Sequence, residues 1–216
     1  MDSSLINAIL DALLSGVGTT VEVAISALAV ALLIGVTLSA VAFLTSNLAV
    51  HAIVRIYVEV LRNVPSLTFL FLLYFGLAAL GIRLSSMVAA ILGLGLIGGA
   101  ITIDIFRSGF QAIPSGQAEA GAAIGLTPLA SFRFIILPQG LRLALPSLGN
   151  YAIALIKDTS LVAAIAAPEI MFNARRLVNE TFETALIYGA AALVYLTLTL
   201  AVAQAVSLLE QRLEVR

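Results

Sequence analysis

The chain has 216 residues, of which 61% are hydrophobic and 11% are charged, and its formal net charge is −1. Soluble domains carry about 25% charged residues, so this composition excludes an ordinary soluble domain and predicts a membrane protein. The near-neutral charge gives no indication of nucleic-acid binding. With no cysteine and a single histidine, His51, the chain has no residues for disulfides, thiolate metal sites or multi-histidine metal sites.

Long segments without formal charge indicate where the membrane spans lie. Four such segments are 32, 20, 20 and 26 residues long, at 23–54, 63–82, 84–103 and 184–209, and a spanning helix needs about 20 apolar residues. A fifth span is interrupted only by Lys157 and Asp158. We therefore predict an all-α membrane protein, a single transmembrane domain over 1–216, with five helices near 17–44, 55–80, 84–108, 143–166 and 185–209.

The second predicted span contains RNVPSLT at 62–68, which can break the helix. Pro65 removes one helical hydrogen bond and frees the carbonyl of Leu61. Broken helices near the membrane midplane often form transporter sites, so Ser66 and Thr68 either satisfy the backbone or contact a substrate. A simple proline kink is an equally good interpretation. We take Ser66 as a candidate substrate-binding residue.

The third predicted span contains GLGLIGG at 93–99, which has the G-x-G-x-x-G spacing. No strand precedes it and no acidic residue follows at about 20 positions, so it is not a dinucleotide-binding site. Gly95 and Gly99 form a GxxxG pair, which is typical of close helix packing in membranes. The partner is either a neighbouring helix or a second copy of the chain.

Asp104 and Arg107 lie toward the end of the same span. Residues three apart share a helix face, and a charge at membrane depth costs about 3 kcal/mol on insertion scales. The two side chains therefore form a structural ion pair, or Asp104 lines a polar pathway. Both interpretations stay open from the sequence.

The segment 112–140 forms the longest connection between spans, and such loops usually have a ligand or a partner. AEAGAAIGL at 118–126 predicts a short alanine-rich helix that Gly125 can end with a left-handed cap. A second helical piece is predicted to end at Pro138. The apolar residues of the loop either dock on a partner or pack on the chain's own helices; they are Ala122, Ile124, Leu126 and Phe132.

The fourth predicted span carries several polar residues inside the membrane. Lys157 and Asp158 are adjacent and point to different faces, and the lysine is long enough to reach the interface. Tyr151 and Asp158 are seven residues apart and share a face, so they could line one wall of a polar channel together with Asn150. We predict Asn150, Tyr151 and Asp158 as further substrate-binding residues.

The arginines predict the orientation, because basic residues gather on the inner side of a membrane. With the N-terminus outside and the C-terminus inside, seven arginines lie inside and three outside. The inner set is Arg55, Arg62, Arg107, Arg133, Arg142, Arg212 and Arg216, and the outer set is Arg83, Arg175 and Arg176. This orientation places the loop 112–140 on the cytoplasmic side.

The loop also resembles a known signature. Glu119-Ala120-Gly121, followed by Gly125, Ile135 and Leu137-Pro138, is similar to the EAA motif of ABC-importer permeases, although the third position is usually alanine in that family. The resemblance implies a coupling helix that binds a separate ATP-binding cassette subunit. Its coupling residues would be Glu119, Ala120, Gly121, Gly125 and Leu126. The chain has no G-x-x-x-x-G-K-[ST] motif of its own, so we expect no cofactor here and ATP and Mg on that partner.

Three further segments, 57–77, 103–120 and 148–165, resemble the polar amino-acid subfamily of these permeases. The resemblance implies the type I importer fold, a second permease subunit, an extracytoplasmic substrate-binding protein and a bacterial or archaeal inner membrane. It also implies an acidic residue lining the pathway at Asp104. The subfamily often has glutamate where Tyr151 stands, so a cationic amino acid is disfavoured and a neutral or acidic one stays open.

Several alternatives remain at this stage. The same kind of permease could carry another small solute, and it could pair with itself or with a similar permease. A passive channel would not need the loop 112–140. A membrane-embedded enzyme could use Asp104 and Asp158 as paired carboxylates, but no H-E-x-x-H or G-x-S-x-G motif supports it. We predict a transporter subunit and not an enzyme.

Overall fold

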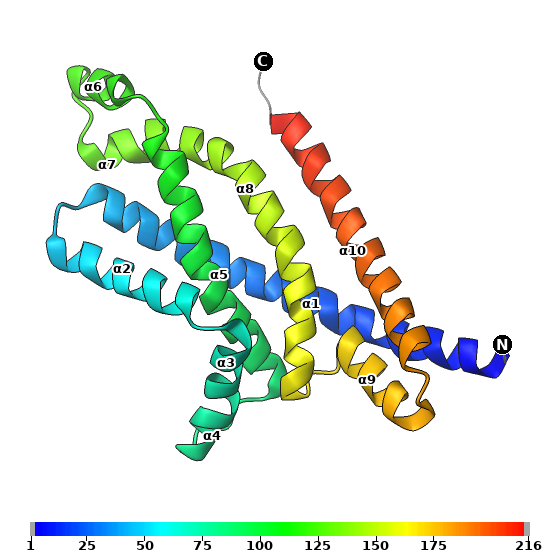
Figure 1. The fold of residues 1–216 in the computed structure, drawn as a ribbon. Coiled ribbons are helices and arrows are strands. Elements are labelled where there is room, and N and C mark those ends of the chain that lie inside the picture. Colours follow the sequence, from blue (N-terminus) through cyan, green and yellow to red (C-terminus); the bar gives the residue numbers. More distant parts are fainter. Residues whose placement is uncertain (1–2, 214–216) are drawn as a thin grey trace.

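The computed structural model describes residues 3–213, and this part of the chain is helical with no β-strand. The predicted all-α fold is confirmed. Figure 1 shows the longest helices crossing one another, with α6 and α7 at one end of the molecule and α4 and α9 toward the other. The elements are α1 (Ser3–Leu44), α2 (Leu48–Asn63), α3 (Ser66–Phe71), η1 (Leu72–Gly76), α4 (Leu77–Ala79), α5 (Ser86–Gln111), α6 (Ser115–Ala123), α7 (Pro128–Ser131), η2 (Phe132–Ile136), α8 (Leu137–Asp158), η3 (Thr159–Ile165), α9 (Ile170–Thr181) and α10 (Thr184–Leu213).

Four segments among the described residues are long and apolar enough to cross a membrane: Ser4–Leu44, Ser86–Gln111, Pro128–Ile165 and Thr184–Arg212. A fifth is formed only if α2 and the helices that follow it count as one broken span, because the two parts meet at an angle of 104°. The described residues therefore contain four spans by length and composition, or five if the bent pair is counted as one broken span.

The helix predicted near 55–80 is interrupted at the segment RNVPSLT. The helix begins at Leu48, where the Asn47 side chain accepts a hydrogen bond from the Ala49 amide, and it ends at Asn63. Val64 and Pro65 are extended, with ψ of 129° and 131°. Proline disfavours the helical conformation of the residue before it, so the chain leaves the helix at Val64 and restarts at Ser66. Of the two interpretations of this segment, the structure has the full break.

The helix α1 is 42 residues long and begins 14 residues before the predicted start at residue 17. The first part of α1 packs against the rest of the protein, because Ile9 and Leu13 are buried in a cluster with residues of α9 and α10. The uncharged part of the span gives no sign of this earlier start, because this end is held by packing on distant helices.

Glycines allow α1 and α5 to lie in close contact. A Cβ atom on Gly95 would stand 2.7 Å from Val30, and one on Gly99 would stand 2.8 Å from Ile34, both residues of α1. The Thr102 hydroxyl donates to the Ala31 carbonyl at 2.7 Å. The GxxxG pair therefore packs against a neighbouring helix of the same chain, as one of its two interpretations required.

Beyond α8 the chain turns through η3 into α9, which runs outside the membrane spans. Glu169 precedes α9 and is fully buried. Its carboxylate accepts from the amides of Met171 at 2.9 Å and Phe172 at 2.7 Å, and from the Tyr195 hydroxyl of α10. The Glu169 side chain therefore caps the N-terminus of α9 and ties this helix to α10.

Candidate functional site

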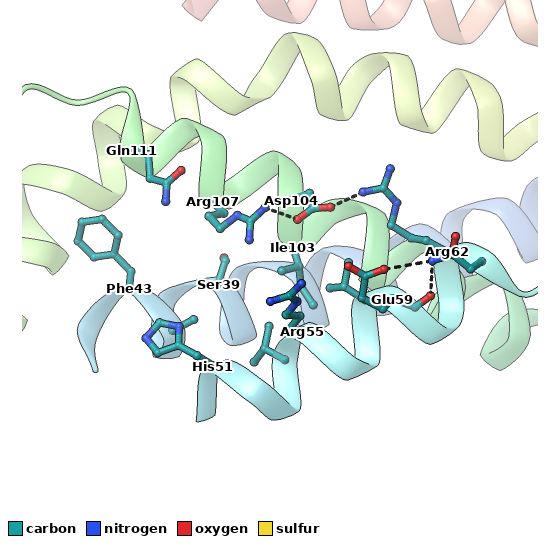
Figure 2. A pocket seen from close by; sticks show the side chains of 14 residues that line it. Ser39, Phe43, His51, Arg55, Glu59, Arg62, Ile103, Asp104, Arg107 and Gln111 are labelled. Carbon is teal, nitrogen blue, oxygen red and sulfur yellow. Dashed lines mark hydrogen bonds and ion pairs between the residues drawn. The ribbon is translucent and has the colours of Figure 1, made fainter. Parts of the chain in front are cut away.

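A pocket of about 790 Å³ lies between the C-terminal part of α1, the helix α2 and the C-terminal half of α5. Figure 2 shows its charged side chains converging from α2 and α5. The lining residues of this α2 pocket are Ser39, Ala42, Phe43, His51, Val54, Arg55, Val58, Glu59, Arg62, Asn63, Ile103, Asp104, Arg107 and Gln111.

The helix α2 has two opposite faces. His51, Arg55, Glu59 and Arg62 recur at intervals of three or four residues and line the pocket, because residues at that spacing share a face. The apolar side chains on the other face are exposed: Ile53 by 68%, Ile56 by 63% and Val60 by 51%. An apolar outer face and a polar inner face suit a helix with lipid or protein on one side and a wet cavity on the other.

Asp104 is the centre of the charged network in the pocket. Its carboxylate accepts from Arg62 of α2 and from Arg107 at 2.9 Å, and its side chain is only 24% exposed. The sequence pattern pairs Asp104 with Arg107 alone, and Arg62 enters it only through the orientation of the spans. The structure contains the Arg107 ion pair and adds the second arginine, 42 residues away in sequence.

The other predicted substrate-binding residues do not line this pocket. Tyr151 is 7% exposed and packs on α5, whereas Asn150 and Asp158 are exposed on α8. Ser66 is partly buried at the start of α3. The helix α3 packs on η3, which begins directly after Asp158, so the elements that carry Ser66 and Asp158 are neighbours. Only Asp104 among the five lies in the α2 pocket.

The hydroxyl groups of two tyrosines pack directly against glycines of α5. A Cβ atom on Gly98 would stand 1.9 Å from the Tyr151 hydroxyl oxygen, and one on Gly99 would stand 2.7 Å from that of Tyr57. The Tyr57 hydroxyl also donates to the Leu96 carbonyl at 2.6 Å. Any larger residue at these two positions would displace a tyrosine ring.

The loop between α5 and α8 contains the predicted short helix. It runs over Ser115–Ala123, and Gly125 follows with φ +81°. The Gly125 amide donates to the Ala122 carbonyl and the Leu126 amide to the Gly121 carbonyl, each at 3.0 Å. The left-handed cap at Gly125 is confirmed.

The second helical piece differs from its prediction. It does not end at Pro138 but continues through η2 into α8, with Pro138 in the first turn. A π-helical turn over Phe132–Ile136 comes immediately before it. Such a turn shifts the hydrogen-bond register, and the first turn of a helix tolerates a residue without an N–H donor.

The loop exposes apolar side chains, but Phe132 is not one of them. Ile124 is 77% exposed, Leu129 63% and Phe134 67%; we call these three the coupling surface. Phe132 is 5% exposed, and its ring lies 5.2 Å from that of Phe110, between centroids. Of the two interpretations left open for this residue, packing on the chain's own helices is correct, because aromatic rings from α1 and α5 cover it.

The motif residues of the loop occupy different environments. Glu119 and Ala120 are exposed, Gly125 is exposed and Leu126 is partly buried. Gly121 is buried, and a Cβ atom there would stand 2.8 Å from the Ser131 Oγ and 3.0 Å from the Ile135 side chain. Glycine in place of the usual alanine therefore fits the serine that faces it.

The two helices that leave the loop touch closely. A Cβ atom on Gly109 of α5 would stand 2.6 Å from the Gly140 carbonyl oxygen of α8, and one on Gly140 would stand 2.4 Å from the Phe110 ring. The two membrane helices that flank the loop, α5 and α8, are therefore in nearly backbone-to-backbone contact. Within residues 3–213 no group of three or more acidic, histidine or cysteine side chains is placed to hold a metal ion.

Comparisons with known proteins agree with this architecture. A family model described as binding-protein-dependent transport system inner membrane component matches residues 31–215. A probable glutamine ABC transporter permease protein of Bacillus subtilis (strain 168) is 35% identical over 158 residues, which cover 73% of each chain. A histidine/lysine/arginine/ornithine transport system permease protein of Salmonella typhimurium is 33% identical over 214 residues, covering 94% of this chain and 93% of the relative.

A solved structure is also similar. It is described as the crystal structure of an amino acid ABC transporter with histidines, and its chain superimposes with a TM-score of 0.89 and 27% identity. The match covers 98% of this chain and 99% of that one. The two chains therefore share their fold over nearly the whole length.

Proposed function

We propose a transport cycle from one premise: this chain belongs to the family of binding-protein-dependent transport system inner membrane components. It is a multi-pass permease subunit of an ABC importer, and ATP is hydrolysed by a separate subunit. The proposed substrate is a polar amino acid. The relatives' names include amino-acid permeases. Tyr151 stands where the subfamily often has glutamate, which disfavours a cationic amino acid and leaves a neutral or acidic one, or a bulkier relative, open.

The observation that carries this proposal is the coupling surface. Ile124 follows α6, Leu129 lies in α7 and Phe134 in η2, and all three are large and exposed, as is the charged Glu119 of α6. Exposed apolar patches rimmed by polar residues mark docking sites. The proposed occupant is the ATP-binding cassette subunit, which would hold the ATP and Mg. Glu119, Ala120, Gly121, Gly125 and Leu126 are the proposed coupling residues.

The proposed orientation follows from this docking. The helices α6 and α7 and the C-terminal end of α10 lie at the same end of the molecule in Figure 1, and this end would face the cytoplasm, with the N-terminus outside. The opposite end, with α4 and α9, would receive the substrate from an extracytoplasmic binding protein. A second permease, identical or similar, would complete the pathway.

The proposed pathway has two levels. Ser66, Asn150, Tyr151 and Asp158 are the proposed contacts nearer the outer end, and Asp104 is the proposed contact in the α2 pocket. ATP binding would close the ATPase pair, move the loop helices and open the pathway outward, and hydrolysis would reset it. The chain's own residues bind and release substrate without covalent chemistry.

The test is to express the chain with its ATPase and its binding protein and to measure complex formation and ATP-dependent amino-acid uptake. Ile124→Glu and Leu129→Glu should abolish both, because each places a charge in the docking surface. Gln117→Glu, at an exposed polar position on α6, is the matched control and should behave as wild type. ATP-dependent uptake without any ATPase bound to the loop, or uptake of no amino acid, would refute the proposal.

A further inference from the structure

The helix α2 presents two charges to the pocket that the Asp104 network does not use. Arg62 and Arg107 are both bound to Asp104. Arg55 makes no hydrogen bond or ion pair with any residue of the described chain, although it lines the same pocket. Glu59 has no ion pair there either, and accepts only from the Asn63 amide at 3.3 Å.

Arg55 and Glu59 are one helical turn apart and share the pocket face of α2. Residues at this spacing lie about 6 Å apart along the helix axis and can pair with each other, yet these two do not. Figure 2 shows the Arg55 side chain extending from α2 into the space below α5. A cation and an anion are thus held side by side and face the same cavity.

This arrangement complements a zwitterion. An arginine guanidinium binds a carboxylate with two parallel hydrogen bonds, and a carboxylate is the natural acceptor for an ammonium group. In an α-amino acid the two groups are carried by one carbon, so a cation and an anion one turn apart can reach both. The pocket volume of about 790 Å³ lies within the range of about 300–1,000 Å³ for small-molecule sites.

The rest of the pocket does not demand one type of substrate side chain. Phe43, Val54, Val58 and Ile103 form apolar walls. The Ser39 hydroxyl is already bound to the Gly35 carbonyl at 2.6 Å, and the carboxylate of Asp104 is already taken by two arginines. Gln111 also lines the pocket without a side-chain hydrogen bond in the described chain, but the charged groups left unpaired there are Arg55 and Glu59. These two could bind the carboxyl and amino groups that all amino acids have.

From these observations we infer that Arg55 binds the α-carboxylate and Glu59 the α-ammonium group of the transported amino acid in the α2 pocket. This inference rests on the proposed amino-acid transport. It assigns to the pocket a second substrate position, nearer the coupling surface than Ser66 and Asp158. Recognition here would be of the zwitterion, so side-chain selection would fall to other contacts.

The test measures equilibrium binding of radiolabelled L-glutamine, L-glutamate and L-histidine to the permease–ATPase complex in lipid nanodiscs, without binding protein. At least one should bind the wild type, and Arg55→Gln and Glu59→Gln should each weaken that binding at least tenfold. Arg55→Lys keeps the charge but loses the two-pronged geometry, so its loss should be smaller than that of Arg55→Gln. Arg176→Gln, an exposed cation on α9 outside the pocket, is the control and should bind as wild type.

A competition arm separates the two charges. The decarboxylated analogue of the ligand that binds should compete poorly against wild type, and Arg55→Gln should discriminate against it less than wild type does. Assembly of each variant is checked by size-exclusion chromatography of the complex. Unchanged amino-acid binding in assembled Arg55→Gln and Glu59→Gln, or no binding of any of the three ligands, overturns the inference. The inference is also overturned if Arg55→Gln loses affinity only for anionic phospholipid, measured with vesicles of phosphatidylglycerol, and not for the amino acid.

ATP-dependent uptake, measured separately with the binding protein present, reports on the proposed function. Uptake with no binding in nanodiscs refutes the zwitterion site and leaves the importer role standing. Binding without uptake supports the site and counts against the role.

Discussion

The hydroxyl oxygen of Tyr151 in α8 lies directly against Gly98 of α5, where a Cβ atom would stand only 1.9 Å from it. The same Cβ atom would stand 2.7 Å from Ala31 of α1. Three membrane helices therefore meet at one glycine, and a single methyl group at this point would disturb all three.

We expect Gly98→Ala to destabilise the chain by about 1–3 kcal/mol, the usual cost of overpacking a core. Gly18→Ala is the matched control, because a Cβ atom there meets nothing within 4 Å. The measurement is the thermal stability of the detergent-solubilised protein by fluorescence-detected size exclusion. Tyr151→Phe removes the nearest atom and should recover part of the loss, and a Gly98→Ala protein as stable as wild type would contradict the packing described.

Asp104→Asn should impair transport much more than stability. The change leaves Arg62 and Arg107 without the carboxylate that they share, so two guanidinium groups repel each other in the α2 pocket. Both arginines are more than half exposed, at 53% and 59%, and ion pairs of that exposure contribute about 0–1 kcal/mol.

The readout is ATP-dependent uptake at least tenfold below wild type, with a melting temperature within a few degrees of it. Glu22→Gln, an exposed acid on α1 outside the pocket, should leave uptake unchanged. If Asp104→Asn takes up substrate normally, the Asp104 network only holds α2 and α5 together and has no role in transport.

Gly121→Ala should weaken the loop, although alanine is usual at this position in the family. Its methyl group would press on the Ser131 Oγ, which is buried without a hydrogen-bond partner among the described residues. Removing that hydroxyl loses no hydrogen bond, so Ser131→Ala alone should be neutral or stabilising, and the double variant should recover most of the loss.

The two measurements are the affinity of the permease for its ATPase and the thermal stability of the permease. Gly116→Ala is the control on the same helix, because a Cβ atom there meets nothing within 4 Å. If Gly121→Ala and the double variant behave alike, contact with Ser131 is not the reason why position 121 is occupied by glycine.

Glu169 should give the stability a pH dependence. Burial raises the pKa of this carboxyl above the ordinary value of 4.5, although bonds from Tyr195 and the amides of Met171 and Phe172 oppose the rise. The folded state then holds the proton more tightly than the unfolded state. Its contribution to stability is complete below pH 4.5 and is lost as the pH rises through the raised pKa.

The check is the melting temperature from pH 4.5 upward in wild type and in Glu169→Gln. We expect the decline with rising pH to be smaller in the variant, which has no proton to lose. Tyr195→Phe removes one of the bonds that oppose the rise, so its decline should extend to higher pH. Identical pH profiles in all three proteins would exclude Glu169 as the source.

Much of the fold follows from local patterns in the sequence. Charge-free segments indicate the spans because hydrocarbon excludes charge, and Gly125 indicates the end of α6 because only glycine accepts its conformation easily. Pro65 marks the break in the second span. The angle of 104° does not follow from that proline, because it depends on which helices α2 and α3 pack against.

The site was harder to predict, because its residues are brought together by tertiary packing. Arg62 and Asp104 are 42 residues apart, and no local pattern pairs them. Phe132 looked exposed because its neighbours in the loop are, and only Phe43 and Phe110 show why it is not. The four-residue spacing of His51, Arg55 and Glu59 was visible, and it could have indicated a polar helix face inside an apolar span.

The contact between Gly109 and Gly140 determines how a push on the loop is passed on. At this point the backbone of α5 meets that of α8, with the Phe110 ring packed beside Gly140, and a helix backbone yields far less than a flexible side chain does. We therefore expect this contact to act as a pivot close to α6. If α6 is displaced sideways, both helices should turn together, and their far ends, next to α3 and η3, should move the greatest distance.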